Sequence, residues 1–545
     1  MPKTPIDALA DEYAASLADL NPIAASEIGL AGYADQMPDY SADGAAALDE
    51  LQANVLSKLD DLAVENSQDH VTRDALTERL TVNRQLHATG VVELNNIASP
   101  VQDIRAVFDL MPTATPEDWH NIAVRLSKVQ TALVGYRGRL AAAAKTGIVP
   151  ARRQVDACIG QSKAAAGGFF ADLIAQASGI PASLQADLQH SATVASHAYQ
   201  EFATYLADDL YGQAREEDAV GQEYYQLASR EFLGATVDLA ETYHWGLEEL
   251  ERITREQQRV ADGIRPSSSI PEARQLLSAD PARQLHGTEA LRRWMQALSD
   301  RTVNNMKRHF HIPAPMDSVE AMIAPTQDGG IYYTGPSEDF SRPGRMWWSV
   351  PEEVTEFTTW REKTTVYHEG VPGHHLQTGQ AAYQSSSLNT WRRMACWVSG
   401  HGEGWALYAE RLMQDLGFLG DDGDLMGMLD SQRLRAARVV VDIGVHLGKP
   451  CPQRWGGGTW DAQKAWDFLN AHVSMEPEFL QFELNRYLGW PGQAPSYKVG
   501  QRLWEQLRDR ARERAGTDFD LAEFHRRALS VGSVGLDTLS AALDR

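Results

Sequence analysis

The stretch that decides the fold runs from Tyr367 to His375 and reads Tyr-His-Glu-Gly-Val-Pro-Gly-His-His. It gathers three histidines and a glutamate, in a chain that has 16 histidines among 545 residues. A His-Glu pair followed closely by another histidine presents two imidazole ligands and a general base from one helix in zinc hydrolases. The usual spacing, H-E-x-x-H, sets both imidazoles on one helical face. Here the gap after His368 is longer, so the regular motif is absent.

The longer gap requires a break in the helix. On a straight α-helix, His374 would lie about 120° around the axis from His368, and His375 about 10 Å along it. Neither position suits two imidazoles that share a metal at about 2 Å from each nitrogen. Pro372 lacks the N–H that would bond the carbonyl of His368, and Gly373 tolerates unusual dihedral angles. We therefore expect a break at Pro372-Gly373 that brings either His374 or His375 beside His368. A polar helix end without a metal is the alternative.

A second stretch supplies a candidate third ligand. Residues 402–410 read Gly-Glu-Gly-Trp-Ala-Leu-Tyr-Ala-Glu, and the apolar residues after Glu403 recur at helical spacing. In zinc hydrolases of the two-His, one-Glu type, the third ligand comes from a following helix and the fourth position is left to water. Glu403 also fits a carboxylate that faces the positive end of a helix dipole. The upstream histidines favour the ligand interpretation.

These two stretches resemble known families. The His-Glu-x-x-Pro-Gly-His-His run at 368–375 resembles the signature of the bacterial family called domain of unknown function 885, which is grouped with zincin metallopeptidases of the Glu-ligand branch. The run at 402–406 is similar to the Asn-Glu-Gly-Phe-Ala run that carries the third zinc ligand in the aminopeptidase N family, with Gly in place of Asn. The segment at 491–498 also resembles the first family, so the resemblance extends over most of the chain. It implies a largely helical, zincin-like fold and a metal-dependent hydrolase.

The motifs and the resemblance together assign roles to individual residues. We expect Zn²⁺ to be held by His368, His374 and Glu403. His374 is preferred to His375 because the Gly-His order resembles the second ligand of related zincins. Glu369 is the expected general base, which takes a proton from water and passes it to the leaving amine. The expected substrate is a peptide or a small amide.

Candidates for binding the oxyanion or the substrate lie further along the chain. Arg438, Asp442 and His446 are spaced four residues apart on an otherwise apolar helix, which indicates either a buried hydrogen-bonded network or a cleft. In a cleft, His446 or Arg438 could stabilise the oxyanion or hold a substrate carboxylate. Tyr497 is a further candidate phenol donor.

A small β-sheet is expected before the metal-binding helix. The segments 330–334 and 345–349 are short, aromatic and β-favouring. A free strand edge there could bind an extended substrate backbone, with Tyr333 as a candidate contact. A two-stranded prop that packs its aromatic side chains inward is the alternative. Ser349 and Glu352 match a capping box, which predicts that the helix carrying His368 begins near Ser349.

The rest of the chain predicts a mainly α protein. Apolar residues recur at three- and four-residue spacings in most segments, including a long helix from about Pro116 to Lys145 and a helical pattern from Gln222 to Asp262. The length exceeds what one hydrophobic core usually supports. We therefore expect an N-terminal helical lobe of residues 1–310 and a metal-site lobe of residues 311–545, which together form one cleft.

Composition narrows the class of partner. The net charge of −24 argues against nucleic acid and anionic membranes. No apolar run is long enough to span a bilayer, and acidic residues interrupt the N-terminal segment, so we expect neither a membrane span nor a signal peptide. Three widely spaced cysteines fit a reducing cytoplasm. The sequence gives no oligomeric state. Two other functions stay open: a di-metal carboxylate oxidase in a helical bundle, and a non-catalytic binding protein.

Overall fold

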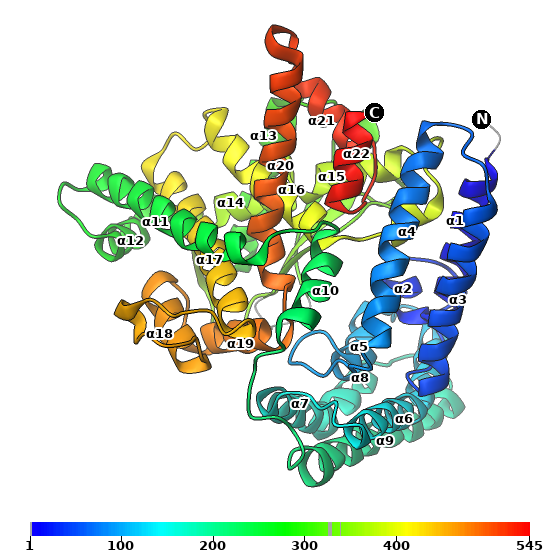
Figure 1. Ribbon diagram of the computed structural model, residues 1–545. Helices are drawn as coiled ribbons and strands as arrows, with labels where there is room; N and C mark the ends of the chain where they lie inside the picture. Colours follow the sequence, from blue (N-terminus) through cyan, green and yellow to red (C-terminus); the bar gives the residue numbers. More distant parts are fainter. Residues whose placement is uncertain (1–2, 325–329, 338) are drawn as a thin grey trace.

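A computed structural model describes residues 3–324, 330–337 and 339–545. The protein is mainly helical, as the sequence predicts, with short strands in the middle of the chain (Figure 1). The helices of the first half are α1 (Pro5–Leu20), α2 (Pro22–Glu27), α3 (Ala42–Asp61), α4 (Ser67–Ala88), α5 (Pro100–Ala106), α6 (Pro116–Lys145), α7 (Arg152–Ala164), α8 (Phe170–Ala175), α9 (Ala182–Tyr205), α10 (Gln222–Leu233), α11 (Leu239–Ile264), α12 (Ile270–Ala279) and α13 (Thr288–Met306). None of the helices in the described part of the chain combines the length and the apolar character that a membrane span needs.

The helices of the second half surround the histidine-rich stretch. They are α14 (Thr359–Glu369), α15 (His374–Tyr383), α16 (Ser399–Asp415), α17 (Asp422–His446), α18 (Ala462–His472), α19 (Pro477–Gly489), α20 (Gln493–Ala515), α21 (Leu521–Leu529) and α22 (Leu536–Asp544). The long helix α6 has the bounds that the sequence predicts, because Thr115 forms a capping box with Asp118 at its start.

The buried apolar residues form two clusters. The smaller cluster contains residues of α2 and of the consecutive helices from α5 through α9. Helices α6 and α9 pack along each other at the bottom of Figure 1. The larger one joins α1, α3 and α4 to the helices from α10 onward. The first helices therefore pack on the C-terminal half of the chain, and Arg545 pairs with Asp74 of α4. The lobe boundary near residue 310 stays a prediction.

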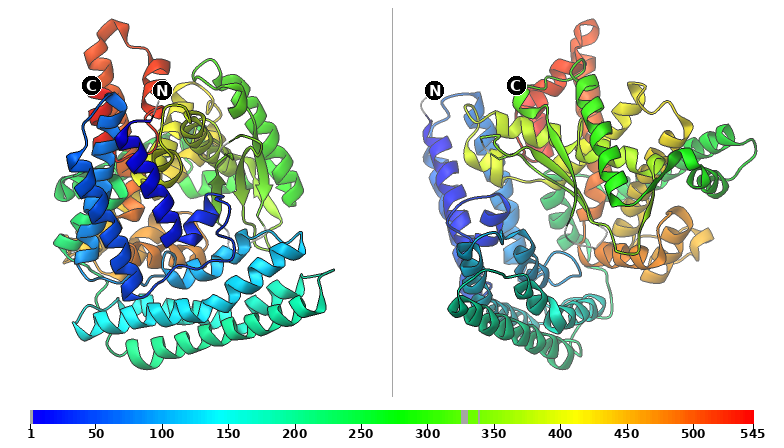
Figure 2. Two further views of the ribbon diagram at one scale, coloured as in Figure 1. Left: turned by 90° about the vertical axis from the view of Figure 1, so that its right-hand side faces the viewer. Right: turned by 180° about the vertical axis from the view of Figure 1, so that it is seen from behind.

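Two small sheets precede and flank α14. The strands β2 (Val319–Ile323), β4 (Gly344–Trp348) and β3 (Ile331–Thr334) form a sheet in that order, with β2 parallel and β3 antiparallel to β4. In the two-stranded sheet, β1 (Gln284–His286) pairs antiparallel with β5 (Glu356–Thr358). Figure 2, in the view from behind, shows these strands crossing the middle of the molecule. The aromatic segments predicted as strands are β3 and β4, and β3 lies at the sheet edge.

The predicted start of the helix that carries His368 is wrong. That helix, α14, begins at Thr359, and the Ser349–Glu352 pair caps no helix. Between them, Phe357 of β5 pairs with Leu285 of β1. A capping box is a local signal, and this long-range strand pairing overrides it.

The helical pattern from Gln222 to Asp262 is also interrupted. Gly234, with φ 57°, ends α10 in the left-handed conformation. The Asp238 side chain then accepts hydrogen bonds from Ala240 N and Glu241 N and so begins α11. The Gly234 α-carbon leaves no room for a side chain, since an added Cβ would lie 2.2 Å from the α-carbon of Gly535. The break therefore serves the docking of the C-terminal segment.

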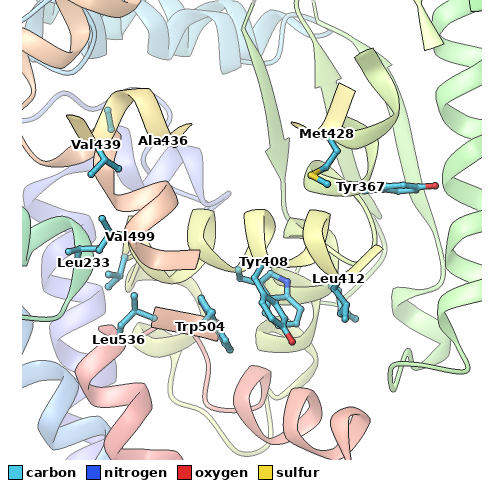
Figure 3. Packing of buried hydrophobic residues seen from close by; sticks show 14 of the residues in the cluster. Leu233, Tyr367, Tyr408, Leu412, Met428, Ala436, Val439, Val499, Trp504 and Leu536 are labelled. Atoms are coloured by element: carbon cyan, nitrogen blue, oxygen red, sulfur yellow. The ribbon is translucent and has the colours of Figure 1, made fainter. Parts of the chain in front are cut away.

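Glycines let α16 and α20 cross in close backbone contact. A Cβ added to Gly404 would lie 2.5 Å from the carbonyl carbon of Gly500, and one added to Gly500 would lie 2.3 Å from Gly400 O. Apolar side chains of both helices pack around this crossing, among them Tyr408 and Trp504, which Figure 3 shows beside each other. The crossing fixes the position of α16, the helix that carries Glu403.

Gly500→Ala is expected to destabilise the protein by about 1–3 kcal/mol, because the two backbones must separate to admit the methyl group. The matched control is Gly138→Ala on α6, where an added Cβ meets nothing within 4 Å. That control should stabilise the protein by about 0.5–1 kcal/mol, through the lower flexibility of the unfolded chain. Midpoints of urea unfolding measure both, and equal shifts would refute the close crossing.

Candidate metal centre

The helix that carries His368 is broken where the sequence predicts. Helix α14 ends at Glu369 and α15 begins at His374, with a cis peptide bond between Val371 and Pro372. A Cβ on Gly373 would lie 1.9 Å from the carbonyl oxygen of His368, so only glycine fits there. The indole N–H of Trp405 on α16 donates to Pro372 O at 2.9 Å, which ties the break to α16.

The break brings two histidines together beside Glu403. The rings of His368 and His374 lie 4.8 Å apart, centroid to centroid, and are nearly perpendicular. Their Nε2 atoms lie 3.2 Å and 3.6 Å from the same carboxylate oxygen of Glu403, Oε2. Glu369 joins them: one potential ligand atom of each of His368, Glu369 and His374 lies within 4.8 Å of the other two. All four side chains are largely buried.

A second glutamate of α16 holds the outer nitrogen of His368. The Nδ1–H of His368 donates to Glu410 Oε1 at 2.7 Å, and Glu410 Oε2 accepts from Thr364 Oγ1 at 2.9 Å. This arrangement orients the imidazole with Nε2 toward Glu403. We did not predict a role for Glu410. The available signal was its position seven residues after Glu403, two helical turns along the same face.

His375 lies outside this cluster, which separates the two alternatives that the sequence left open. Its Nε2–H donates to Met316 O at 2.9 Å, and its Nδ1 accepts from the hydroxyl of Tyr333 at 2.8 Å. Burial lowers the pKa of His375 to about 4, so the ring is neutral. With both nitrogens occupied, His375 is a structural residue, and His374 is the histidine placed beside His368.

The ring of His374 is held by aromatic contacts. Tyr333 of β3 stacks on it, with centroids 6.5 Å apart, and Trp397 lies 6.1 Å away on another side. The Trp397 indole also covers Gly402, where a Cβ would lie 2.3 Å from the ring. Tyr333, predicted as a substrate contact, therefore packs on His374 and bonds to His375. That packing explains the tyrosine without a substrate, and its contact with substrate stays a prediction.

The carboxyl groups of the cluster hold their protons differently. Burial raises the pKa of Glu369, although the two histidines act against it. Burial acts in the same sense on Glu403, but there the histidines prevail and hold the pKa well below its usual range. Burial lowers the pKa of His368, yet its hydrogen bonds to Glu403 and Glu410 raise it to about 10. Two neighbouring carboxyl groups with opposite shifts suit different roles.

Arg438 and Tyr497 belong to a polar cluster on α17, α19 and α20. Arg438 is buried; its Nε donates to the hydroxyl of Tyr487 at 2.7 Å, and its Nη2 pairs with Glu483. Its guanidinium also lies 5.2 Å from the ring centre of Tyr497, and Arg486 lies over the same ring. Burial raises the pKa of the Tyr497 phenol, and the charge of Glu403 adds to this. Tyr497 lies on α20 three residues before Gly500, whose backbone meets Gly404 beside Glu403.

His446 is placed away from the cluster. Its Nε2–H donates to Tyr487 O at 2.9 Å, and its ring packs against Tyr225. On the same helix, Ser431 lies 3.5 Å from Glu410. His446 follows Ser431 by 15 residues, or about 22 Å along α17. We therefore do not retain His446 as an oxyanion donor. Of the two alternatives for this polar stripe, the buried network describes Asp442 and His446.

Arg435 is another residue for which we did not predict a role. Its Nη1 donates to Ser431 Oγ at 2.6 Å, and its charge lowers the pKa of both Glu369 and Glu410. Within the described residues, no carboxylate forms an ion pair with Arg435. It is a partly buried cation beside the cluster. In the sequence it is one of several arginines on α17, and nothing there distinguishes it.

Comparisons with known proteins agree with this picture of the fold. The family described as "Bacterial protein of unknown function (DUF885)" matches residues 22–543. A solved structure titled a "putative lipoprotein" from Colwellia psychrerythraea is 23% identical, with a TM-score of 0.85, and the match covers 99% of this chain and 98% of that one. A similarly titled protein "of unknown function" from Shewanella oneidensis is 15% identical, with a TM-score of 0.76 and full coverage of both chains. No curated protein matches the chain.

The buried carboxyl group of Asp442 makes the stability of the native state depend on pH. It is fully buried, and its Oδ1 accepts from Tyr225 at 2.7 Å and from Gly492 N at 3.0 Å. Burial raises its pKa to about 7. An ordinary Asp has a pKa of about 3.9, so the unfolded chain releases this proton first and the native state loses stability as pH rises from about 4 to about 7.

The variant Asp442→Asn has no carboxyl group at this position, so it does not lose this stability as pH rises. Relative to wild type, the variant should gain on the order of 1–4 kcal/mol between pH 4.5 and pH 8, with no further gain above pH 8. Urea unfolding of both proteins at each pH measures the difference, from which other titrating groups cancel. A difference that is the same at both pH values would contradict the raised pKa.

Proposed function

The chain belongs to the DUF885 family, and we propose that it is a zinc-dependent hydrolase, a zincin-like metallopeptidase that cleaves peptide or small amide bonds. One observation carries the proposal: the Nε2 atoms of His368 and His374 converge on a single oxygen of Glu403. Two imidazoles and one carboxylate are the donor set of many catalytic zinc sites. Glu410 supports the fit, because a carboxylate that orients a ligand histidine is the usual partner of such a site.

The roles follow from the positions of the side chains. His368, His374 and Glu403 would hold the metal, which supplies Lewis acidity toward water and the substrate carbonyl. Glu369 takes a proton from the attacking water as its oxygen bonds to the carbonyl carbon. The C–N bond then breaks, and Glu369 passes the proton to the departing nitrogen. Burial of Glu369 raises its pKa, which suits a group that must take up and release a proton.

Tyr497 and the edge strand β3 are candidates for contacting the substrate in this mechanism. Tyr497 is the candidate donor to the oxyanion, since it lies on α20 three residues before Gly500, which meets Gly404 beside Glu403. The edge strand β3 carries Tyr333 onto His374, so a substrate backbone paired with β3 would pass the metal-binding histidines. Arg438 is paired with Glu483, and we now assign it to positioning Tyr497 rather than to binding substrate. A cytoplasmic location remains part of the proposal.

The metal content of the purified protein tests the ligand set. Wild type should contain about one zinc per chain by inductively coupled plasma mass spectrometry, and His374→Ala and Glu403→Ala should lose it. The matched control is His375→Gln, which should keep the metal because His375 bonds to Met316 and Tyr333. Glu369→Gln should also keep it, while hydrolysis of a peptide library falls about 100-fold or more.

Other outcomes identify the other functions. Two irons per chain would support a di-metal oxidase. No metal after zinc loading would leave a non-catalytic binding protein. Zinc retained in both His374→Ala and Glu403→Ala would refute the ligand set.

Glu410→Gln tests the outer hydrogen bond of His368. The amide can accept the Nδ1–H but carries no charge, so we expect zinc affinity to fall about 10- to 100-fold. Competition with a chromogenic chelator measures this. The matched control is Glu362→Gln on α14, whose carboxylate accepts from the Trp348 indole instead of a histidine. If both variants lose affinity equally, the role of Glu410 is not specific.

A further inference from the structure

A large cavity lies apart from the metal-centre residues. Its volume is about 690 Å³, within the range of pockets that hold small molecules. The lining comes from the segment 89–94 after α4, the end of α6 and the loop after it, α10, and the segment 488–491 at the end of α19. Figure 1 shows α10 between the N-terminal helices and α19. None of His368, Glu369, His374 or Glu403 lines it.

Most of the wall is apolar. Val91, Val92, Ile148 and Leu227 contribute aliphatic surface. Phe232 and Trp490 meet edge to face, with ring centroids 5.3 Å apart. Such a wall favours a ligand with a hydrocarbon or aromatic body, because burying it removes apolar surface from water.

The charged groups of the cavity are mostly acidic. Glu93, Glu223 and Glu231 line it, and Arg215 is the one cation among the lining residues. Arg215 Nη1 donates to the carbonyl of Ala219. Among the residues that the structure describes, no hydrogen bond or ion pair holds the carboxylate of Glu93 or Glu231. The nearby Arg79 forms an ion pair with Glu78 and donates hydrogen bonds to backbone carbonyls of α10.

Glu93 and Glu231 repel each other inside this cavity. Glu93 is exposed to solvent and Glu231 is half-buried, and both line the cavity. The surrounding protein, with the charge of Glu231 next in importance, raises the pKa of Glu93, although the charge of Arg139 acts against this. Burial also raises the pKa of Glu231. A cation bound in the cavity would relieve the repulsion between them and supply the hydrogen-bond donors that both carboxylates lack.

We propose that this cavity binds an organic cation, namely a primary ammonium group on an apolar or aromatic body. An anion is excluded by the surplus of carboxylates. A bare metal ion would leave the apolar walls facing water. The ligand occupies a site separate from the metal centre, so this inference does not depend on the proposed hydrolase activity.

Isothermal titration of the full-length protein with 2-phenylethylamine at pH 8 tests the proposal. We expect saturable binding, and binding of the neutral analogue 2-phenylethanol at least tenfold weaker, because the alcohol has the same body without the charge. Glu93→Gln and Glu231→Gln should each weaken the amine at least tenfold. The matched control is Glu248→Gln, an exposed carboxylate on α11 that does not line the cavity. It removes the same charge and should bind the amine as wild type does.

Several results would overturn the proposal. One is no saturable binding of the amine. Another is equal binding of the amine and the alcohol to wild type, a comparison that needs no variant to fold. A third is full affinity in both Glu93→Gln and Glu231→Gln. Glu403→Ala should keep the binding; if binding is lost there, the amine occupies the metal centre and the cavity assignment is wrong.

Discussion

The interruption between α14 and α15 is the constraint on which the geometry of the candidate metal centre depends. A continuous helix would carry His374 around the axis, away from His368. Gly373 permits the interruption, since its α-carbon lies against the carbonyl oxygen of His368. Trp405 holds it by donating to Pro372 O. The same helix α16 carries Glu403, so this indole hydrogen bond joins the interruption to the helix of the shared carboxylate.

The position of α16 is in turn fixed by packing contacts between uncharged groups. Its glycines admit the backbone of α20 and the indole of Trp397, and larger residues at Gly402 or Gly404 would displace one or the other. Glu403 stands between these two glycines. The Gly-Glu-Gly run therefore combines one functional candidate with two packing requirements, and the packing fixes the direction in which the carboxylate points.

Much of the fold and part of the site follow from the sequence. The helical pattern and the break after His368 depend on local spacing and on the chemistry of Pro372 and Gly373. The preference for His374 over His375 comes from a resemblance to related zincins. The start of α14 does not follow from local spacing, because the pairing of β5 with β1 is invisible to a local capping signal. The position of His375 outside the cluster also depends on distant segments, because its two ring nitrogens form hydrogen bonds with Met316 and Tyr333.

Residues that look functional in the sequence can owe their chemistry to positioning others. Arg438 and Arg486 share Glu483, and both guanidiniums lie against the ring of Tyr497. Two cations on one ring fix its orientation and oppose the effect of Glu403, since positive charge lowers a phenol pKa and negative charge raises it. Burial and the charge of Glu403 outweigh the two arginines, so the pKa of the phenol stays above its usual value and the hydroxyl keeps its proton. A protonated hydroxyl is what a hydrogen-bond donor to a developing oxyanion requires. In the proposed mechanism the arginine pair would position the ring of Tyr497 without itself touching the substrate.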